Sequence, residues 1–138
     1  MTDELKKFLA TGIIEALHPT QDCLCEYHVD NADRDVKNKG VGRIRELYLV
    51  VPQVLLHPTA VYRGLPSRGA DWLCYAGLPD RAFDYRTGLR IPPWQGEVFL
   101  VYINASLFVY NWRWETADLI SAGLPAESDP TRYSTKVR

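Results

Sequence analysis

Hydrophobic and polar positions follow two different periods along this chain, one near its start and another in its second half. The apolar side chains near the start recur every three or four residues, at Leu5, Phe8, Leu9, Ile13, Ala16 and Leu17. That spacing places them on one face of a helix. Gly12 weakens the middle of this helix. We expect the helix to end at His18, because the residue before a proline disfavours the α region.

The two segments that follow are shorter or less regular. Residues 23–29 form a β-prone run, which predicts a short edge strand. Residues 30–42 are polar and charged and contain glycines at their end, which is typical of a mobile loop.

Residues 43–51 are ambiguous, since their apolar positions fit a helical stripe and also alternate like a strand. Pro52 forbids an uninterrupted helix through that point. We favour a helix over residues 43–50, followed by a turn or a second short helix that ends at His57.

Strands are predicted from residue 59 onward. Four runs of β-branched and aromatic residues indicate them, at 59–65, 71–76, 97–103 and 107–115. In the last run the aromatic side chains alternate and are expected to face the core together, at Phe108, Tyr110, Trp112 and Trp114. The long connection over residues 77–96 contains prolines and glycines, and connections of that length are often functional.

These patterns predict a single α+β domain over residues 1–138, in which N-terminal helices pack on a C-terminal four-stranded antiparallel sheet. A chain of 138 residues is the usual size for one core. Residues 124–138 are mostly polar and are expected to form a loosely ordered tail.

Charge favours no large class of partner. The formal net charge is −1, so no overall field attracts nucleic acid or anionic lipid. Ten of the eleven basic residues after position 40 are arginines, whose planar group suits carboxylate or phosphate. No signal peptide or apolar span is visible, so we expect a cytoplasmic protein with no membrane partner.

One cluster has potential metal ligands, Cys23-x-Cys25-x-x-His28. A structural zinc site needs four ligands, usually from two such pairs, and the chain has no second pair. Strand alternation also places His28 on the side opposite to the two thiols. We therefore expect no metal and no cofactor.

The candidate catalytic residues of this chain are of the types that a metal-independent ribonuclease uses. Such an enzyme requires a base, an acid and cations around the phosphorane. Four residues are predicted to supply these groups: His57, Arg63, Arg113 and Glu115. Three more are predicted to bind RNA, Tyr75 by stacking on a base and Arg68 and Asn111 by polar contact. The alternative is that His57 caps a helix end and that Arg113 and Glu115 are only solvated.

The order of the elements resembles that of the barnase–RelE-type toxin ribonucleases. The resemblance covers about residues 43–115 and includes the short motif His57-Pro58-Thr59-Ala60-Val61-Tyr62. It implies helices at the front, a four-stranded antiparallel sheet and RNA as the partner, cleaved without metal or cofactor.

A second hypothesis from another class is a non-catalytic protein-interaction or immunity-type module. It would use exposed Trp72, Trp94 and arginines as anchors for a protein partner. Arginines gathered on one concave surface would favour RNA, whereas an exposed apolar patch with scattered charge would favour a protein. The sequence leaves open whether the chain is an enzyme.

Overall fold

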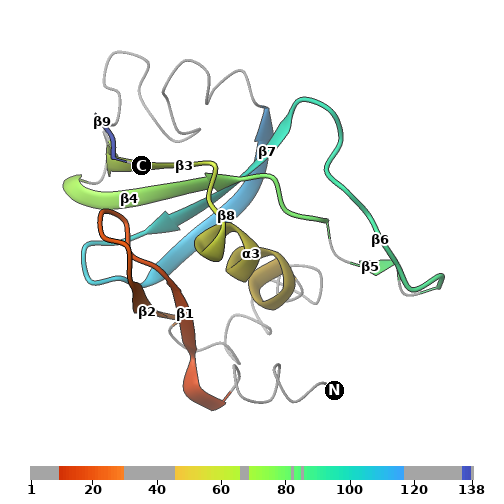
Figure 1. Ribbon diagram of the computed structural model, residues 1–138, viewed down its shortest axis with the longest axis horizontal. Coiled ribbons are helices and arrows are strands. Elements are labelled where there is room, and N and C mark those ends of the chain that lie inside the picture. The colour runs from red at the N-terminus through yellow and green to blue at the C-terminus, as the bar shows by residue number, and fades with distance from the viewer. Residues whose placement is uncertain are drawn as a thin grey trace.

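The computed structural model describes residues 10–29, 46–65, 69–81, 83–84, 86–116 and 135–137. Its main element is a five-stranded antiparallel sheet in the order β8-β7-β4-β3-β9 (Figure 1). The strands of this sheet are β3 (Ala60–Leu65), β4 (Gly69–Gly77), β7 (Glu97–Ile103), β8 (Val109–Thr116) and β9 (Thr135–Lys136). Two small hairpins accompany it, formed by β1 (Ile13–Leu17) with β2 (Leu24–His28), and by β5 (Phe83–Asp84) with β6 (Leu89–Arg90). A π-helical turn, η1 (Glu46–Val50), leads into the helix α3 (Val51–Leu56).

The predicted α+β fold class is wrong, because the described chain is mostly β and its N-terminal part is not a pair of packed helices. The longest complete helix in the described ranges, α3, has six residues. Ile13–Leu17, expected to end the first helix, form strand β1, in which Ile14 and Ala16 are buried and Glu15 is exposed. Gly12 has a φ of 64°, and a Cβ there would lie 2.8 Å from the carbonyl oxygen of Val29. Residues 1–9 of the predicted helix lie outside the described ranges.

The four strands predicted after residue 59 are confirmed with small shifts of their ends, and helical structure is confirmed over residues 46–50. Pro52 lies in the first turn of α3, where the π-helical turn η1 gives way to the α-helix. Predicted loop 30–42 and most of tail 124–138 lie outside the described residues, but Thr135 and Lys136 pair with β3.

No helix in the part of the chain that the structure describes is long and apolar enough to cross a membrane. The cytoplasmic location stays a prediction.

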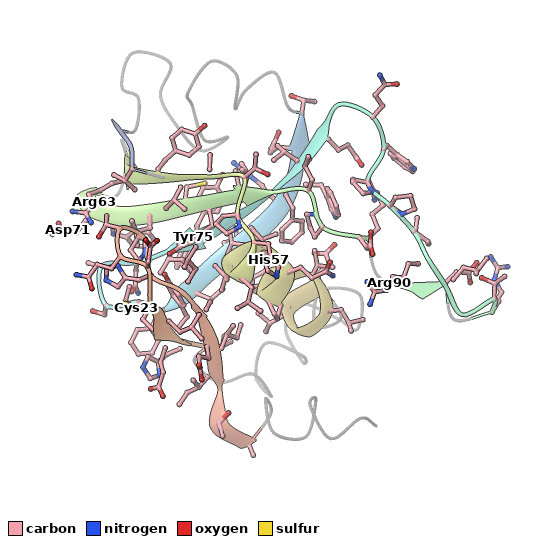
Figure 2. All side chains as sticks on the ribbon, viewed as in Figure 1. Cys23, His57, Arg63, Asp71, Tyr75 and Arg90 are labelled. Carbon is pink, nitrogen blue, oxygen red and sulfur yellow. The ribbon has the colours of Figure 1, made fainter. Side chains whose placement is uncertain are left out.

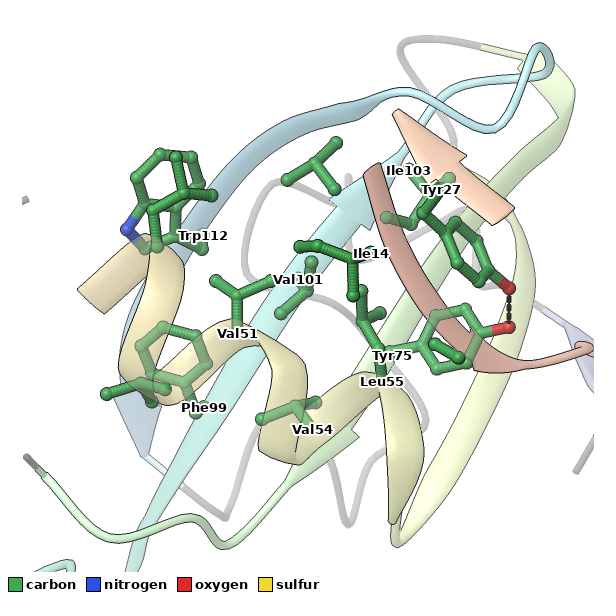
Figure 3. Close-up of a cluster of buried hydrophobic side chains, with 14 of the residues drawn as sticks. Ile14, Tyr27, Val51, Val54, Leu55, Tyr75, Phe99, Val101, Ile103 and Trp112 are labelled. Carbon is green, nitrogen blue, oxygen red and sulfur yellow. Dashed lines mark hydrogen bonds between the residues drawn. The ribbon is translucent and has the colours of Figure 1, made fainter. Parts of the chain in front are cut away.

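The larger core lies between the sheet and α3 (Figure 3). Val51, Val54 and Leu55 project from α3 onto buried side chains of β4 and β7, among them Tyr75 and Val101. The helix comes so close to β4 that a Cβ at Gly77 would lie 3.2 Å from Cγ1 of Val54. A glycine at the end of β4 therefore lets the helix rest directly on the strand.

Two buried phenols attach the β1–β2 hairpin to this core. Backbone hydrogen bonds join Gly12 to Val29 and His18 to Cys23 across the hairpin. In an antiparallel pair every second residue forms such bonds, so Leu17, which lies next to His18, turns its carbonyl away from β2. The hydroxyls of Tyr27 and Tyr75 lie 3.1 Å and 3.0 Å from that carbonyl oxygen and also contact each other. The carbonyl of Leu17, which has no partner within the hairpin, is thus where the two phenols attach the hairpin to the core.

The predicted aromatic face of β8 is only partly correct. Trp112 and Trp114 pair with Val101 and Phe99 and face α3, as expected. The register shifts between Tyr102 and Ile103, so that β8 carries one extra residue there. Tyr110 consequently leaves the core face and makes an edge contact with Trp72, with 5.2 Å between ring centroids.

Candidate functional site

The two faces of the main sheet separate the predicted catalytic residues. Partners directly opposite each other in an antiparallel pair share one face. Arg63 pairs with Leu73, which belongs to the core under α3. Arg113 pairs with Leu100, which belongs to a second cluster on the opposite face. The structure therefore places the two arginines on opposite faces.

His57 lies on the α3 side and apart from the arginines. It follows the last residue of α3, is exposed, and donates its backbone N–H to the carbonyl oxygen of Gln53 at 3.0 Å. Figure 2 shows Arg63 at the far end of β3, beside Asp71, and His57 at the end of the helix. The convergence of His57, Arg63 and Arg113 that an RNA cleft needs is not formed.

Arg113 and Glu115 are brought together. The Nε atom of Arg113 lies 3.4 Å from a carboxylate oxygen of Glu115, and its Nη2 donates to the hydroxyl of Tyr102 at 3.4 Å. The guanidinium carbon also lies 5.6 Å from the centroid of the Tyr102 ring. The contact between the two charges is an ion pair only, since the geometry at Nε does not meet that of a hydrogen bond. This arrangement orders the surface of β8 against β7.

Two of the three residues predicted to bind RNA, Tyr75 and Asn111, lie within the described residues. Tyr75 is fully buried, and its hydroxyl is engaged with Leu17 and Tyr27, so its ring has no face for a base. Burial, together with the hydrogen bond to Tyr75, raises the pKa of Tyr27 far above that of an ordinary phenol. Asn111 is half-buried and its side-chain oxygen accepts from the backbone N–H of Trp112 at 2.9 Å. Arg68 lies outside the described residues.

The cysteines are free thiols, exposed at Cys23, half-buried at Cys25 and buried at Cys74. Burial raises the pKa of the Cys25 thiol, which makes the thiolate scarcer and the group less nucleophilic. Across the ranges that the structure describes, no three His, Cys, Asp or Glu side chains gather where a metal ion would need them.

The feature that stands out is a long insertion between β4 and β7, residues 78–96, which we call the arm. Gly77 and Phe99 are paired neighbours in the sheet, so a turn of two to five residues is enough to join these strands. The arm instead runs out beyond the sheet, forms the two-residue strands β5 and β6, and returns (Figure 1). The sheet therefore does not require the arm, which suggests a separate role for it.

The base of the arm is fixed by Arg81. Its guanidinium forms two hydrogen bonds with the carboxylate of Glu97, one from Nε at 3.2 Å and a shorter one from Nη2. The same group lies 4.0 Å from the ring centroid of Trp94 and 4.6 Å from that of Trp114. Glu97 also accepts the backbone N–H of Trp94 at 2.9 Å, and the bonds from Arg81 lower its pKa. We call Arg81, Trp94, Glu97 and Trp114 the clamp.

The other charges of the arm are also paired within it. Arg90 reaches Asp80 at 3.1 Å, and Arg86 lies 3.6 Å from Asp84. Asp80 in turn donates its backbone N–H to the side chain of Gln53 on α3 at 3.3 Å. Three arginines thus meet three carboxylates, and the arm with its clamp has no excess charge.

Four large apolar side chains among the described residues of the arm are exposed. Their exposed fractions are 60% for Leu78, 66% for Leu89, 40% for Ile91 and 68% for Trp94. Sequence reasoning pointed to the long connection and to Trp94, but it missed the other three and the clamp. The available signal was a segment of 20 residues that held apolar side chains without the period of a helix or strand.

Comparisons with protein-family models, with curated proteins and with solved structures gave no match. The resemblance to toxin ribonucleases is therefore untested and stays a prediction.

Proposed function

We propose that this protein is a protein-binding module and that the arm is its contact surface. The observation that carries the proposal is the exposure of Leu78, Leu89, Ile91 and Trp94 on one insertion that the sheet does not need. Several exposed large apolar side chains on one segment are often a site of protein–protein interaction. A partly exposed tryptophan among aliphatic residues is also the usual composition at the centre of a protein interface.

The charges of the arm support a protein partner more than RNA. Binding to a phosphate backbone draws its affinity from arginines and lysines that release counterions. Arg81, Arg86 and Arg90 each have a carboxylate beside them, so a phosphate would compete with an existing ion pair. The arginines of the sheet, Arg63 and Arg113, lie on opposite faces and do not add to the arm.

A photo-crosslinking amino acid placed at Leu89 tests this proposal in cells that express the protein. We expect a protein adduct that disappears when Ile91→Glu is added. Leu24, a leucine on β2 that is 54% exposed, is the matched control position and should give no such adduct. Equal labelling from positions 24 and 89, or adducts that survive Ile91→Glu, would remove the proposal.

An armless variant provides a second test. Residues 79–97 are replaced by Asn-Gly, a sequence that favours the tight turn of a hairpin, because Gly77 pairs with Phe99 and a two-residue loop then joins Leu78 to Val98. We expect a folded protein with an unchanged β-sheet spectrum by circular dichroism and no adduct from a crosslinker at Leu78. Labelled single-stranded RNA is titrated in parallel, and binding by the intact chain that weakens steeply with salt would instead favour the RNA hypothesis.

A further inference from the structure

The β5–β6 hairpin at the outer part of the arm is very short. Each strand has two residues, and both residues of β6, Leu89 and Arg90, are exposed. A two-stranded hairpin is marginally stable in water unless a third strand or a packed layer covers its apolar side. The clamp fixes the base of the arm, but its anchoring contacts are on Glu97 and Trp114, outside the hairpin.

We infer that the exposed apolar side chains of the arm are covered by the arm of a second copy of this chain, so that the protein forms a symmetric dimer. This inference rests on the proposed function and names its partner. In a two-fold dimer the same patch meets itself, so the patch must be self-complementary in both apolar surface and charge.

The charges of the arm meet that condition. Arg86 is paired with Asp84 and Arg90 with Asp80, and the clamp adds one more acid and one more base. Two identical arms therefore approach without net repulsion, and each arm offers both acids and arginines to the other. A strongly acidic or strongly basic partner has no comparable attraction to a surface of balanced charge.

The apolar area is also sufficient. The exposed fractions of Leu78, Leu89, Ile91 and Trp94 amount to roughly 500 Å² of surface in each copy. If all of this surface is covered, two copies together bury about 1,000 Å², which is the lower limit for a specific interface. An interface of this size is typical of reversible association, so we expect the dimer to form only as the protein concentration is raised.

Sedimentation velocity from about 5 µM to about 1 mM tests the inference. For the wild-type chain, we expect the average mass to rise from that of one chain toward that of two. Leu89→Glu should remain a monomer throughout, because its carboxylate would be buried at the two-fold interface. Leu24→Glu, which adds the same charge at an exposed leucine of β2, should associate like the wild type. Circular dichroism is expected to show equal folding in all three.

A wild-type chain that stays monomeric at about 1 mM overturns the dimer. So does a Leu89→Glu variant that associates as the wild type does. The crosslinker at Leu89 then separates the two ideas. An adduct with a different protein, lost with Ile91→Glu, leaves the protein-binding function standing without the dimer. Failure of both the association and the arm-specific adduct removes the two together.

Discussion

Trp112 gives the strongest expected effect on stability. Its side chain is 1% exposed, and its indole N–H donates to the carboxylate of Glu46 at 3.1 Å. Trp112→Ala removes about 140 Å³, and if half of that volume stays empty the cavity costs about 1.7 kcal/mol. The lost transfer of a large apolar side chain adds roughly 1.5–3 kcal/mol. We therefore expect the free energy of unfolding to fall by about 3–5 kcal/mol, which is large against the stability of a small domain.

Urea unfolding followed by circular dichroism, at a few micromolar protein, measures this loss. Trp94→Ala is the matched control, since it removes the same atoms from an exposed side chain and should cost less than about 1 kcal/mol. Trp112→Phe keeps most of the volume but loses the bond to Glu46, for an intermediate cost of about 1.5–3 kcal/mol. Equal losses for the two alanine variants would refute the register that points Trp112 into the core.

Three further outcomes follow from single contacts. The ring nitrogen Nδ1 of His18 accepts hydrogen bonds from the backbone N–H groups of Thr20 and Gln21, both at 3.1 Å. His18→Ala should therefore lower the free energy of unfolding, measured by thermal denaturation, by about 1 kcal/mol. His18→Asn, which has an oxygen in a similar place, should retain most of that free energy. Tyr27→Phe and Tyr75→Phe should each cost about 1 kcal/mol, and the double variant more than both together in a double-mutant cycle, because only then does the Leu17 carbonyl lose both phenols. The pKa of Glu97 is lowered in the folded protein, so its contribution to folding stability is complete above the ordinary carboxyl value of 4.5 and is lost as the pH falls through the folded-state pKa. The amide resonance of Trp94, whose N–H is bonded to this carboxylate, should therefore shift with a titration midpoint below 4.5. That transition should vanish in Glu97→Gln.

Four of the five strands of the main sheet were predictable because their sequences are short runs rich in β-branched and aromatic residues, whereas β9 lies in the segment expected to be a loose tail. Residues 97–103 are apolar on both faces, as a central strand must be, and they form β7 between two neighbours. Residues 13–17 satisfied both periods, and the choice was made by contacts distant in sequence. Tyr75, 58 residues from Leu17, bonds to the carbonyl that β1 turns outward. A propensity that is nearly balanced is decided by such tertiary contacts.

The candidate site was less predictable because it depends on faces and registers. Arg63 and Arg113 look alike in sequence, since each lies in a strand among aromatic residues. Their partners, Leu73 and Leu100, place them on opposite faces, and nothing local in the sequence fixes those pairings. Tyr75 lies on a strand, as predicted, but its side chain points under the helix into the core.

The arm has a base that is held by the clamp and an outer part whose apolar side chains are exposed, and Trp94 belongs to both. Arg81 and Glu97 share two hydrogen bonds, and Trp114 lies on β8, which the sheet holds in place. Leu89 and Ile91 have no part in these contacts, and each of them costs free energy while it faces water. If the arm served only to connect two strands, a short polar turn would do so without exposing apolar surface, because the end of β4 lies beside the start of β7. The clamp instead holds the base of the arm in place before a partner binds to the apolar outer part. Less conformational entropy is then lost on binding.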